Sequence, residues 1–277
     1  MTNAALEISE DYSSEDYSSE ENAPDIWIDA FHIMADTISK YDRGHVVVFE
    51  ADEFIGATRL SASACSRIGA GLVTVLAGQS NPALQLSLPA DIMVKQSRLD
   101  DLSNVTTLLG GPGGISKHHL ELLLDCKPSI MRVLDAGALS EKLRHKNLGL
   151  NTVITPHDGE FESVFGNLLG DRVSQTQNAA KKINCIIVRK GAKTIIAHPN
   201  GRSVINDNPN PFLAKAGTGD VLAGFIAGLI AQSIPVFEAC CAAVWIHSNA
   251  GDRLGPGLTA CDLEYTLPDI LREIYHD

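Results

Sequence analysis

Along the chain, short runs of apolar and β-branched residues alternate with stretches in which small and apolar residues recur at helical spacing. The runs predict strands and the stretches between some of them predict helices. The predicted strands cover residues 45–50, 72–77, 91–95, 105–111, 130–137 and 151–156, and the predicted helices residues 57–69, 117–126, 159–165 and 175–182. Strands that are apolar at nearly every position are typical of a mostly parallel sheet covered on both faces. The pattern therefore predicts a three-layer α/β/α domain.

The pattern changes in the last third of the chain, where strand-like runs at 185–191 and 193–206 follow each other without a helix between them. Within the second run, Pro199-Asn200-Gly201 is typical of a hairpin turn. We therefore expect an antiparallel margin on the sheet. Three predicted helices close the chain, the first after Asp220, the second through 241–251 and the third over 262–275. In such a sheet, ligands bind beyond the carboxyl ends of the parallel strands.

The acidic charge is concentrated at the beginning of the chain. The formal net charge is −12, but residues 1–25 hold eight acidic residues and no Lys or Arg, so the remainder carries only −4. This stretch includes the near-repeat EDYSSEDYSSE and few large apolar residues, and burial cannot offset the entropy of ordering it. We expect a disordered acidic tail over 1–25 and a single domain over 26–277. A docking or phosphorylated segment is the alternative for the tail.

Composition indicates which classes of partner the protein does not bind and in which cellular compartment we expect it. The body offers no basic stripe of the kind that nucleic-acid binding needs. The six cysteines show no CxxC or His-associated metal spacing, which favours reduced thiols in the cytoplasm. No basic-then-apolar leader opens the chain, and the apolar run at 221–231 is too short to span a bilayer. We therefore expect a cytoplasmic protein that binds neither nucleic acid nor membranes.

The segment AKAGTGDVLAGFIAGLIAQ, residues 214–232, carries the strongest indication of chemistry. Gly217 and Gly219 allow a ligand to approach the backbone closely, and the unpaired N–H groups at a helix start attract anions. An ionised Asp220 beside a bound phosphoryl group would accept the proton of an attacking hydroxyl. The alternative is that Asp220 only caps the helix. The small residues Ala223, Gly224, Ala227 and Gly228 predict close packing of this helix on another helix or on the sheet.

Three further turns lie at predicted strand ends. They are LLGGPGG at 108–114, ITPHDGEFESVF at 154–165 and VRKGAKT at 188–194. The first would admit a ligand to its backbone, the second gathers Thr155, His157 and Glu160, and Lys190 in the third suits a nucleotide phosphate or ribose. An ordinary βα turn, a surface histidine and a solvated lysine are the alternatives.

Taken together, these motifs resemble the ADP- or ATP-dependent NAD(P)H-hydrate dehydratases, a family within the ribokinase-like fold. The resemblance rests on GPG ending at Gly113, TPHDGE at 155–160, KGAKT at 190–194 and AGTGDVLAG at 216–224, and runs from about Tyr41 to the C-terminus. It is greatest to the bacterial, ADP-using branch. The resemblance implies a metabolite-repair lyase that dehydrates hydrated NADH and NADPH. In this reaction the nucleotide phosphorylates the substrate hydroxyl, and phosphate is then eliminated.

The resemblance also implies roles for individual residues. Asp220 would be the catalytic base. The hydrated substrate would contact Ala57, Gly113, His157 and Asp220, and the adenine nucleotide would contact Lys190, Gly191, Ala192, Lys193, Thr194 and Gly219. Mg²⁺ is expected with ADP or ATP, Glu160 would act at most as an outer-shell participant, and no metal ligand is assigned. A homotetramer and a separate epimerase partner are further expectations, because many bacterial relatives carry an epimerase domain where this chain has its acidic head.

Two segments depart from the family pattern. Glu50, Asp52 and Glu53 stand where small residues are usual, and extra carboxylates would repel a phosphate-bearing substrate by up to a few kcal/mol. The usual DADAL segment is DAGAL here, with Gly137 in place of the second Asp. These departures would be explained by a catalytically silent nucleotide-binding relative, which is one alternative. A small-molecule kinase of the same fold is the other, because it would also keep the GTGD step.

Overall fold

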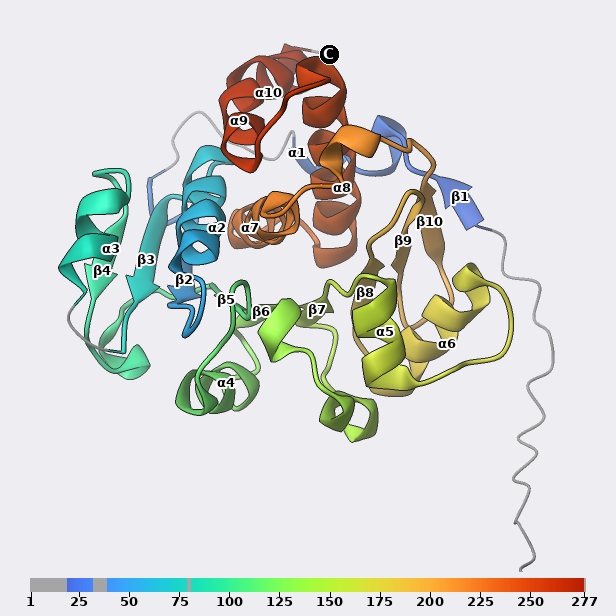
Figure 1. Cartoon of the computed structure of the whole chain (residues 1–277), viewed down its shortest axis with the longest axis horizontal. Helices are drawn as coiled ribbons and strands as arrows, with labels where there is room; N and C mark the ends of the chain where they lie inside the picture. Colours follow the sequence, from blue (N-terminus) through green and yellow to red (C-terminus); the bar gives the residue numbers. More distant parts are fainter. Residues whose placement is uncertain (1–18, 32–38, 79–80, 277) are drawn as a thin grey trace, which may run out of the picture.

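A ten-stranded sheet runs through the part of the chain that the computed structural model describes, residues 19–31, 39–78 and 81–276 (Figure 1). The order of its strands is β1-β10-β9-β8-β7-β6-β5-β2-β3-β4. The strands are β1 Ser19–Glu21, β2 His45–Phe49, β3 Leu72–Leu76, β4 Met93–Lys95, β5 Thr107–Gly110, β6 Met131–Leu134, β7 Thr152–Ile154, β8 Ile186–Arg189, β9 Thr194–Ala197 and β10 Ser203–Asn206.

The seven strands from β4 to β8 in this order pair in parallel, whereas β9 pairs antiparallel with both of its neighbours. The turn between β9 and β10 is closed by the His198 N–H, which donates to the carbonyl oxygen of Arg202 at 2.9 Å. Gly201 in this turn has φ 97°, a value that glycine adopts readily. The mostly parallel sheet with an antiparallel margin is therefore confirmed, as is the hairpin.

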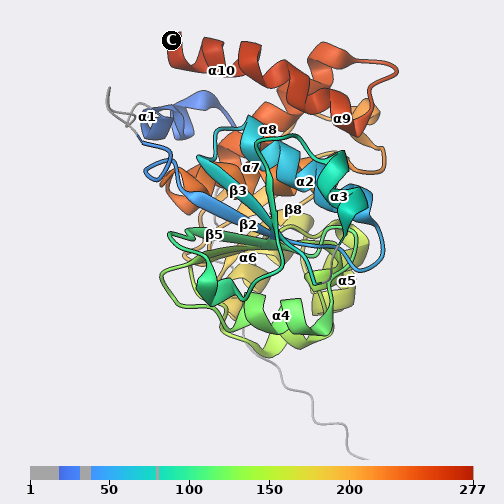
Figure 2. The same cartoon turned by 90° about the vertical axis from the view of Figure 1, so that its left-hand side faces the viewer.

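Helices cover both faces of the sheet (Figures 1 and 2). On one face α2, α7 and α8 pack against the strands, with α1, α9 and α10 on their outer side, and α4, α5 and α6 cover the other face. The helices are α1 Ile28–Phe31, α2 Ile55–Arg67, α3 Pro82–Ser87, α4 Lys117–Leu124, α5 Asp158–Phe165, α6 Arg172–Ile183, α7 Thr218–Ala231, α8 Val236–Leu254, α9 Ala260–Leu263 and α10 Leu267–His276. This is the predicted three-layer α/β/α architecture. None of the helices in the described ranges combines the length and apolar character needed to cross a membrane.

Successive residues of each central strand belong to different cores. In β2, Val46 and Val48 join the core beneath α2, α7 and α8, while Val47 and Phe49 join the core beneath α4, α5 and α6. Because side chains alternate across a sheet, a strand buried on both faces is expected to be apolar at most of its positions. The continuous apolar runs in the sequence thus follow from the two helical layers.

Helix α7 lies against α2 with almost no side-chain layer between them. A Cβ atom on Gly224 would lie 2.5 Å from the carbonyl oxygen of Ser61, and one on Gly228 would lie 2.2 Å from Cγ2 of Ile68. Both distances are too short for any side chain. The packing partner that the small residues of α7 require is therefore another helix, α2.

The start of the ordered fold corrects the expected extent of the acidic tail. Residues 1–18 lie outside the described residues, but 19–21 form β1, which pairs in parallel with β10. Next to it, Asn22 is buried and its Nδ2 donates to Oδ1 of Asn206 at 3.0 Å and to the carbonyl oxygen of Cys241 at 2.8 Å. Backbone pairing with an existing sheet edge requires no apolar side chains. Residues 19–25 therefore belong to the described fold and not to a disordered tail.

Candidate active site

The carboxyl ends of four adjacent strands meet at one edge of the sheet. β5, β6, β7 and β8 are neighbours in the sheet, and each is followed by a loop that carries residues singled out from the sequence. The start of α7 lies beside these loops, because Gly219 is close to the Lys190 side chain that follows β8. The glycine-edged turns are thus gathered where a parallel sheet binds its ligands.

Asp220 lies in the first turn of α7 and does not cap the helix. The N-cap is Gly217, with φ 91°, and no side chain hydrogen-bonds at this cap. Within the described part of the chain, no group donates a hydrogen bond to the Asp220 carboxylate. Burial and the negative charge of Asp135 raise the pKa of Asp220 to about 6, although Lys190 opposes the rise. A carboxylate with a pKa near neutrality and no fixed partner is suited to act as a general base.

Lys190 points into this centre. Its Nζ donates to Oδ1 of Asp135 at 2.6 Å and lies 3.9 Å from Oε2 of Glu160. A Cβ atom on Gly219 would lie 3.5 Å from the same nitrogen. The solvated lysine that the sequence left open is therefore excluded, and a positive charge stands at the start of α7.

Asp135 and His247 complete the centre, and the sequence had assigned a role to neither. Asp135 directly follows β6 and is 1% exposed, and its position after an apolar strand was the signal that could have identified it. His247 is buried in α8, where its Nε2 donates to the carbonyl oxygen of Thr218 at 2.9 Å. Burial lowers the pKa of His247 to about 4, so the ring is neutral. It fixes the first turn of α7.

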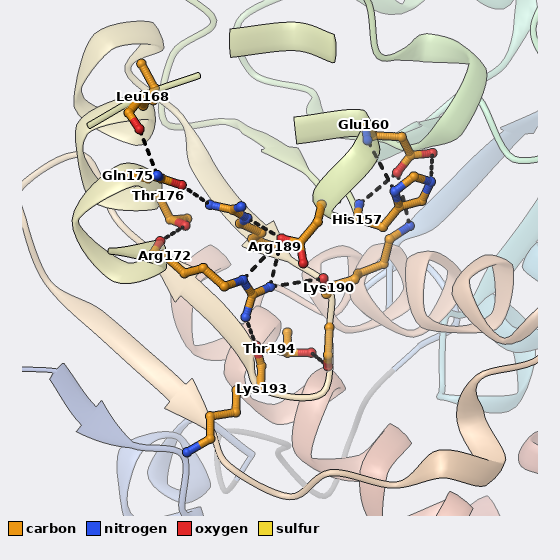
Figure 3. A network of polar contacts seen from close by, with 12 residues as sticks. His157, Glu160, Leu168, Arg172, Gln175, Thr176, Arg189, Lys190, Lys193 and Thr194 are labelled. Atoms are coloured by element: carbon orange, nitrogen blue, oxygen red, sulfur yellow. Dashed lines mark hydrogen bonds and ion pairs between the residues drawn. The ribbon is translucent and has the colours of Figure 1, made fainter. Parts of the chain in front are cut away.

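His157 forms the N-cap of α5 as part of a capping box. The Glu160 N–H donates to its Nδ1 at 3.2 Å, and the His157 N–H donates to Oε2 of Glu160 at 2.8 Å. Its side chain is 60% exposed and lies beside Lys190, whose N–H donates to the carbonyl oxygen of Pro156 at 2.8 Å (Figure 3). The histidine therefore has a structural role and also an open ring at the rim of the site.

The predicted nucleotide turn connects β8 to β9. The hydroxyl of Thr194 donates to the carbonyl oxygen of Gly191 at 3.3 Å, and Ala192 is exposed. Lys193 points away from the centre, because its Nζ bonds Oδ2 of Asp207 at 2.5 Å. Of the two lysines in the KGAKT segment, Lys190 is therefore the one whose ammonium group lies beside α7.

Ala57 and Gly113 are in contact on the substrate side. Gly113 has φ 73°, and a Cβ atom there would lie 2.8 Å from Cβ of Ala57. The Gly113 carbonyl oxygen accepts hydrogen bonds from the N–H groups of Glu53 at 3.3 Å and Phe54 at 2.9 Å. The structure thus brings the two residues together at the start of α2.

Of the acidic residues that depart from the family pattern, Glu50 is held by hydrogen bonds and Asp52 is exposed beside the glycine turn. Oε2 of Glu50 accepts from the N–H of Gly78 at 3.1 Å, and its Oε1 accepts from Nδ2 of Asn81 at 2.8 Å. Glu50 therefore joins the ends of β2 and β3. Asp52 is exposed and lies against the glycine turn, since a Cβ atom on Gly114 would meet its Oδ1 at 2.2 Å.

Gly137 is required by the packing of two loops. A Cβ atom there would lie 2.8 Å from Cα of Gly114 and 3.2 Å from the backbone N of Ile115. Because these are backbone atoms, an aspartate at this position would force the two loops apart. The change from the usual DADAL segment thus accompanies a close contact between the loops that follow β5 and β6.

A cavity of about 1150 Å³ lies away from this centre, against α4, and its lining includes residues 96–102. None of the site residues predicted from the sequence lines it. In the part of the chain that the structure describes, no three His, Cys, Asp or Glu side chains are grouped so that they could hold a metal ion.

Comparison with known sequences identifies relatives over most of the chain. The sequence model of the NAD(P)H-hydrate dehydratases matches residues 46–273. A bifunctional NAD(P)H-hydrate repair enzyme of Methanopyrus kandleri is 32% identical over 252 residues, which cover 84% of this chain and 50% of that protein. An ADP-dependent (S)-NAD(P)H-hydrate dehydratase of Neisseria meningitidis is 32% identical over 221 residues, which cover 71% of this chain and 72% of that protein. The chain spans about half the length of the bifunctional relatives it matches.

Solved structures show the same architecture. A ribokinase-like protein of Enterococcus faecalis has a TM-score of 0.80 and 26% identity, covering 89% of this chain and 94% of that one. The ADP/ATP-dependent NAD(P)H-hydrate dehydratase of Bacillus subtilis was co-crystallised with ATP and Mg²⁺. Its structure has a TM-score of 0.76 and 26% identity, covering 87% of this chain and 93% of that one. The expected ribokinase-like fold is confirmed.

Proposed function

Because the chain belongs to the NAD(P)H-hydrate dehydratase family, we propose that it dehydrates hydrated NADH and NADPH at the expense of an adenine nucleotide. The observation that carries this proposal is that two groups lie together at the start of α7. They are Asp220, with a pKa of about 6, and the ammonium group of Lys190. One group accepts a proton and the other stabilises phosphate charge, and phosphoryl transfer to a hydroxyl needs both.

The first step transfers a phosphoryl group. Asp220 accepts the proton of the substrate hydroxyl while the hydroxyl oxygen bonds to the terminal phosphorus, and the bond from phosphorus to the nucleotide breaks. The Lys190 ammonium group and the first N–H groups of α7 stabilise the charge on the phosphoryl oxygens. In the second step the C–O bond breaks, phosphate leaves and the ring loses a proton, which restores the dihydronicotinamide.

The remaining contacts follow the resemblance. The hydrated substrate is proposed to contact Ala57, Gly113 and His157, and the nucleotide to contact Gly219 and the turn 190–194. Mg²⁺ is typically held by one or two carboxylates together with substrate phosphates. Glu160, 3.9 Å from Lys190 Nζ at the centre, would act at most in the outer shell of the ion, and no direct metal ligand is assigned. The ion would neutralise phosphate charge. ADP as the preferred donor, a tetrameric assembly and a cytoplasmic location stay predictions.

A single assay tests the proposal. Purified protein with Mg²⁺ and ADP or ATP should restore the absorbance band of NADH from hydrated NADH, and Asp220→Asn should abolish turnover while nucleotide binding persists. Nucleotide binding without turnover by the unaltered protein would contradict the proposal and favour a silent relative. Stable accumulation of a phosphorylated alcohol would favour a kinase.

A further inference from the structure

An ionic network joins α5, α6 and the turn between β8 and β9 (Figure 3). At its centre is Arg172, the first residue of α6. Its Nη1 donates to the carbonyl oxygen of Lys193 at 2.8 Å, and its Nη2 donates to that of Lys190 at 3.4 Å. Its Nε donates to Oδ1 of Asp158 at 3.1 Å. One guanidinium group therefore contacts both ends of the turn and ties it to α5.

The guanidinium group lies against the backbone of the turn. A Cβ atom on Gly191 would lie 2.7 Å from Nη2 of Arg172, so a side chain at 191 would displace it. In a planar trans peptide the N–H points opposite to the C=O. Because the Lys190 carbonyl group faces Arg172, the Gly191 N–H points away from Arg172 and is directed outward from the turn.

The far end of the network is anchored in the core. Oδ1 of Asp158 also accepts from Nε of Arg189 at 2.7 Å, and Arg189 is buried with its guanidinium 4.0 Å from the ring centre of Phe161. Although burial opposes the change, the guanidinium groups of Arg189 and Arg172 hold the pKa of Asp158 below its usual value. Asp158 follows His157 directly, so the network connects the turn to the substrate side of the site.

We propose that Arg172 is a positioning residue for the adenine nucleotide: it holds the turn 190–194 so that the Gly191 N–H and the Lys190 ammonium group meet the nucleotide together. Arg172 itself does not touch the reacting atoms. The inference rests on the proposed function for the identity of the ligand. An arginine is needed because its rigid planar fork reaches two carbonyl oxygens and a carboxylate at once.

Arg172→Met tests the inference. Calorimetry should show MgADP and MgATP dissociation constants raised at least tenfold, equivalent to about 1.4 kcal/mol. At saturating nucleotide, the KM for hydrated NADH should stay within threefold of that of the unaltered protein. A general loss of folding would not produce this split. Arg172→Lys, which keeps the charge but not the fork, should also raise both dissociation constants.

Arg202→Met is the matched control. The Arg202 side chain is 37% exposed against 34% for Arg172, and like Arg172 it pairs with a carboxylate, in this case Glu238 at 3.3 Å. Among the described residues, the Arg202 side chain forms no hydrogen bond or ion pair with the turn 190–194. Its loss should leave nucleotide affinity unchanged.

An Arg172→Met protein that binds nucleotide within twofold of the unaltered protein would overturn the inference, as would an equal loss in Arg202→Met. If Arg172→Met fails to fold, Asp158→Asn replaces it, and the dissociation constants should again rise. An unaltered protein that binds MgADP without turnover contradicts the proposed function alone, and the dissociation constants still decide the role of Arg172. An unaltered protein that binds no adenine nucleotide overturns both.

Discussion

Replacing Asp220, the proposed catalytic base, should make the folded protein more stable. In Asp220→Asn the carboxylate is lost from a site where burial and Asp135 disfavour its charge, raising its pKa from a usual 3.8 to about 6. A folded-state pKa above the unfolded value means that stability falls as pH rises through this interval. The asparagine does not titrate, so the free energy of unfolding of the variant does not fall through this titration as the pH rises.

The size of the effect follows from the two pKa values. A rise from 3.8 to about 6 corresponds to roughly 3 kcal/mol above pH 6 as an upper bound. Asp220 is only half-buried, so water screens part of this penalty, and we expect about 1–2 kcal/mol at pH 8. At pH 4 the aspartate is largely protonated in the folded state, and the difference should fall below about 1 kcal/mol.

Urea unfolding followed by the fluorescence of the buried Trp27 measures this difference at both pH values. Asp262→Asn is the matched control, because Asp262 is also the third residue of its helix, α9, but accepts hydrogen bonds from the Thr259 N–H and hydroxyl, each at 2.7 Å. Those bonds lower the pKa of Asp262, so its loss should destabilise the protein at pH 8 and matter less as the pH falls. An Asp220→Asn variant no more stable than the unaltered protein at pH 8 would refute the reasoning.

Two further substitutions test the centre and its support. Asp135→Asn should move the acid limb of kcat/KM to lower pH, because the charge that raises the pKa of Asp220 is removed while Lys190 remains; a pH profile with an unmoved limb would contradict this. Gly228→Ala should lower the free energy of unfolding by about 1–3 kcal/mol, since its Cβ would lie 2.2 Å from Cγ2 of Ile68. Urea unfolding checks the second expectation, and unchanged stability would show that α2 and α7 can separate freely.

The central sheet was predictable because strands that are buried on both faces appear in the sequence as continuous apolar runs. In β2, residues 46–49 are all apolar, and the hairpin after β9 is marked by its turn residues. β1 shows no such pattern, because residues 19–21 are polar and join the sheet through backbone pairing, with an added ion pair between Glu20 and Arg202. Helix α3 was also missed, since Pro82–Ser87 is too short to show a helical period.

The site was predictable where glycine shapes the backbone and not where partners come from distant segments. Gly219 and Asp220 were identified from their own stretch of sequence. The ion pair of Lys190 with Asp135 joins residues 55 positions apart, and local pattern holds no information on which of several acids a lysine will meet. The same holds for Glu50, whose expected repulsion of substrate assumed a free carboxylate, whereas its oxygens bond Gly78 and Asn81.

The contact of α7 with α2 also limits how the protein can move during turnover. Ala57 lies in α2 and Asp220 in α7, and the two helices meet with backbone against side-chain carbon at Gly224 and Gly228. Helices without an intervening side-chain layer cannot slide past each other by exchanging rotamers. Ala57, the proposed substrate contact, and Asp220, the proposed base, are therefore expected to move as one rigid body. We therefore expect an opening that admits the substrate in loops such as those that follow β2, β5 and β8 rather than between these two helices.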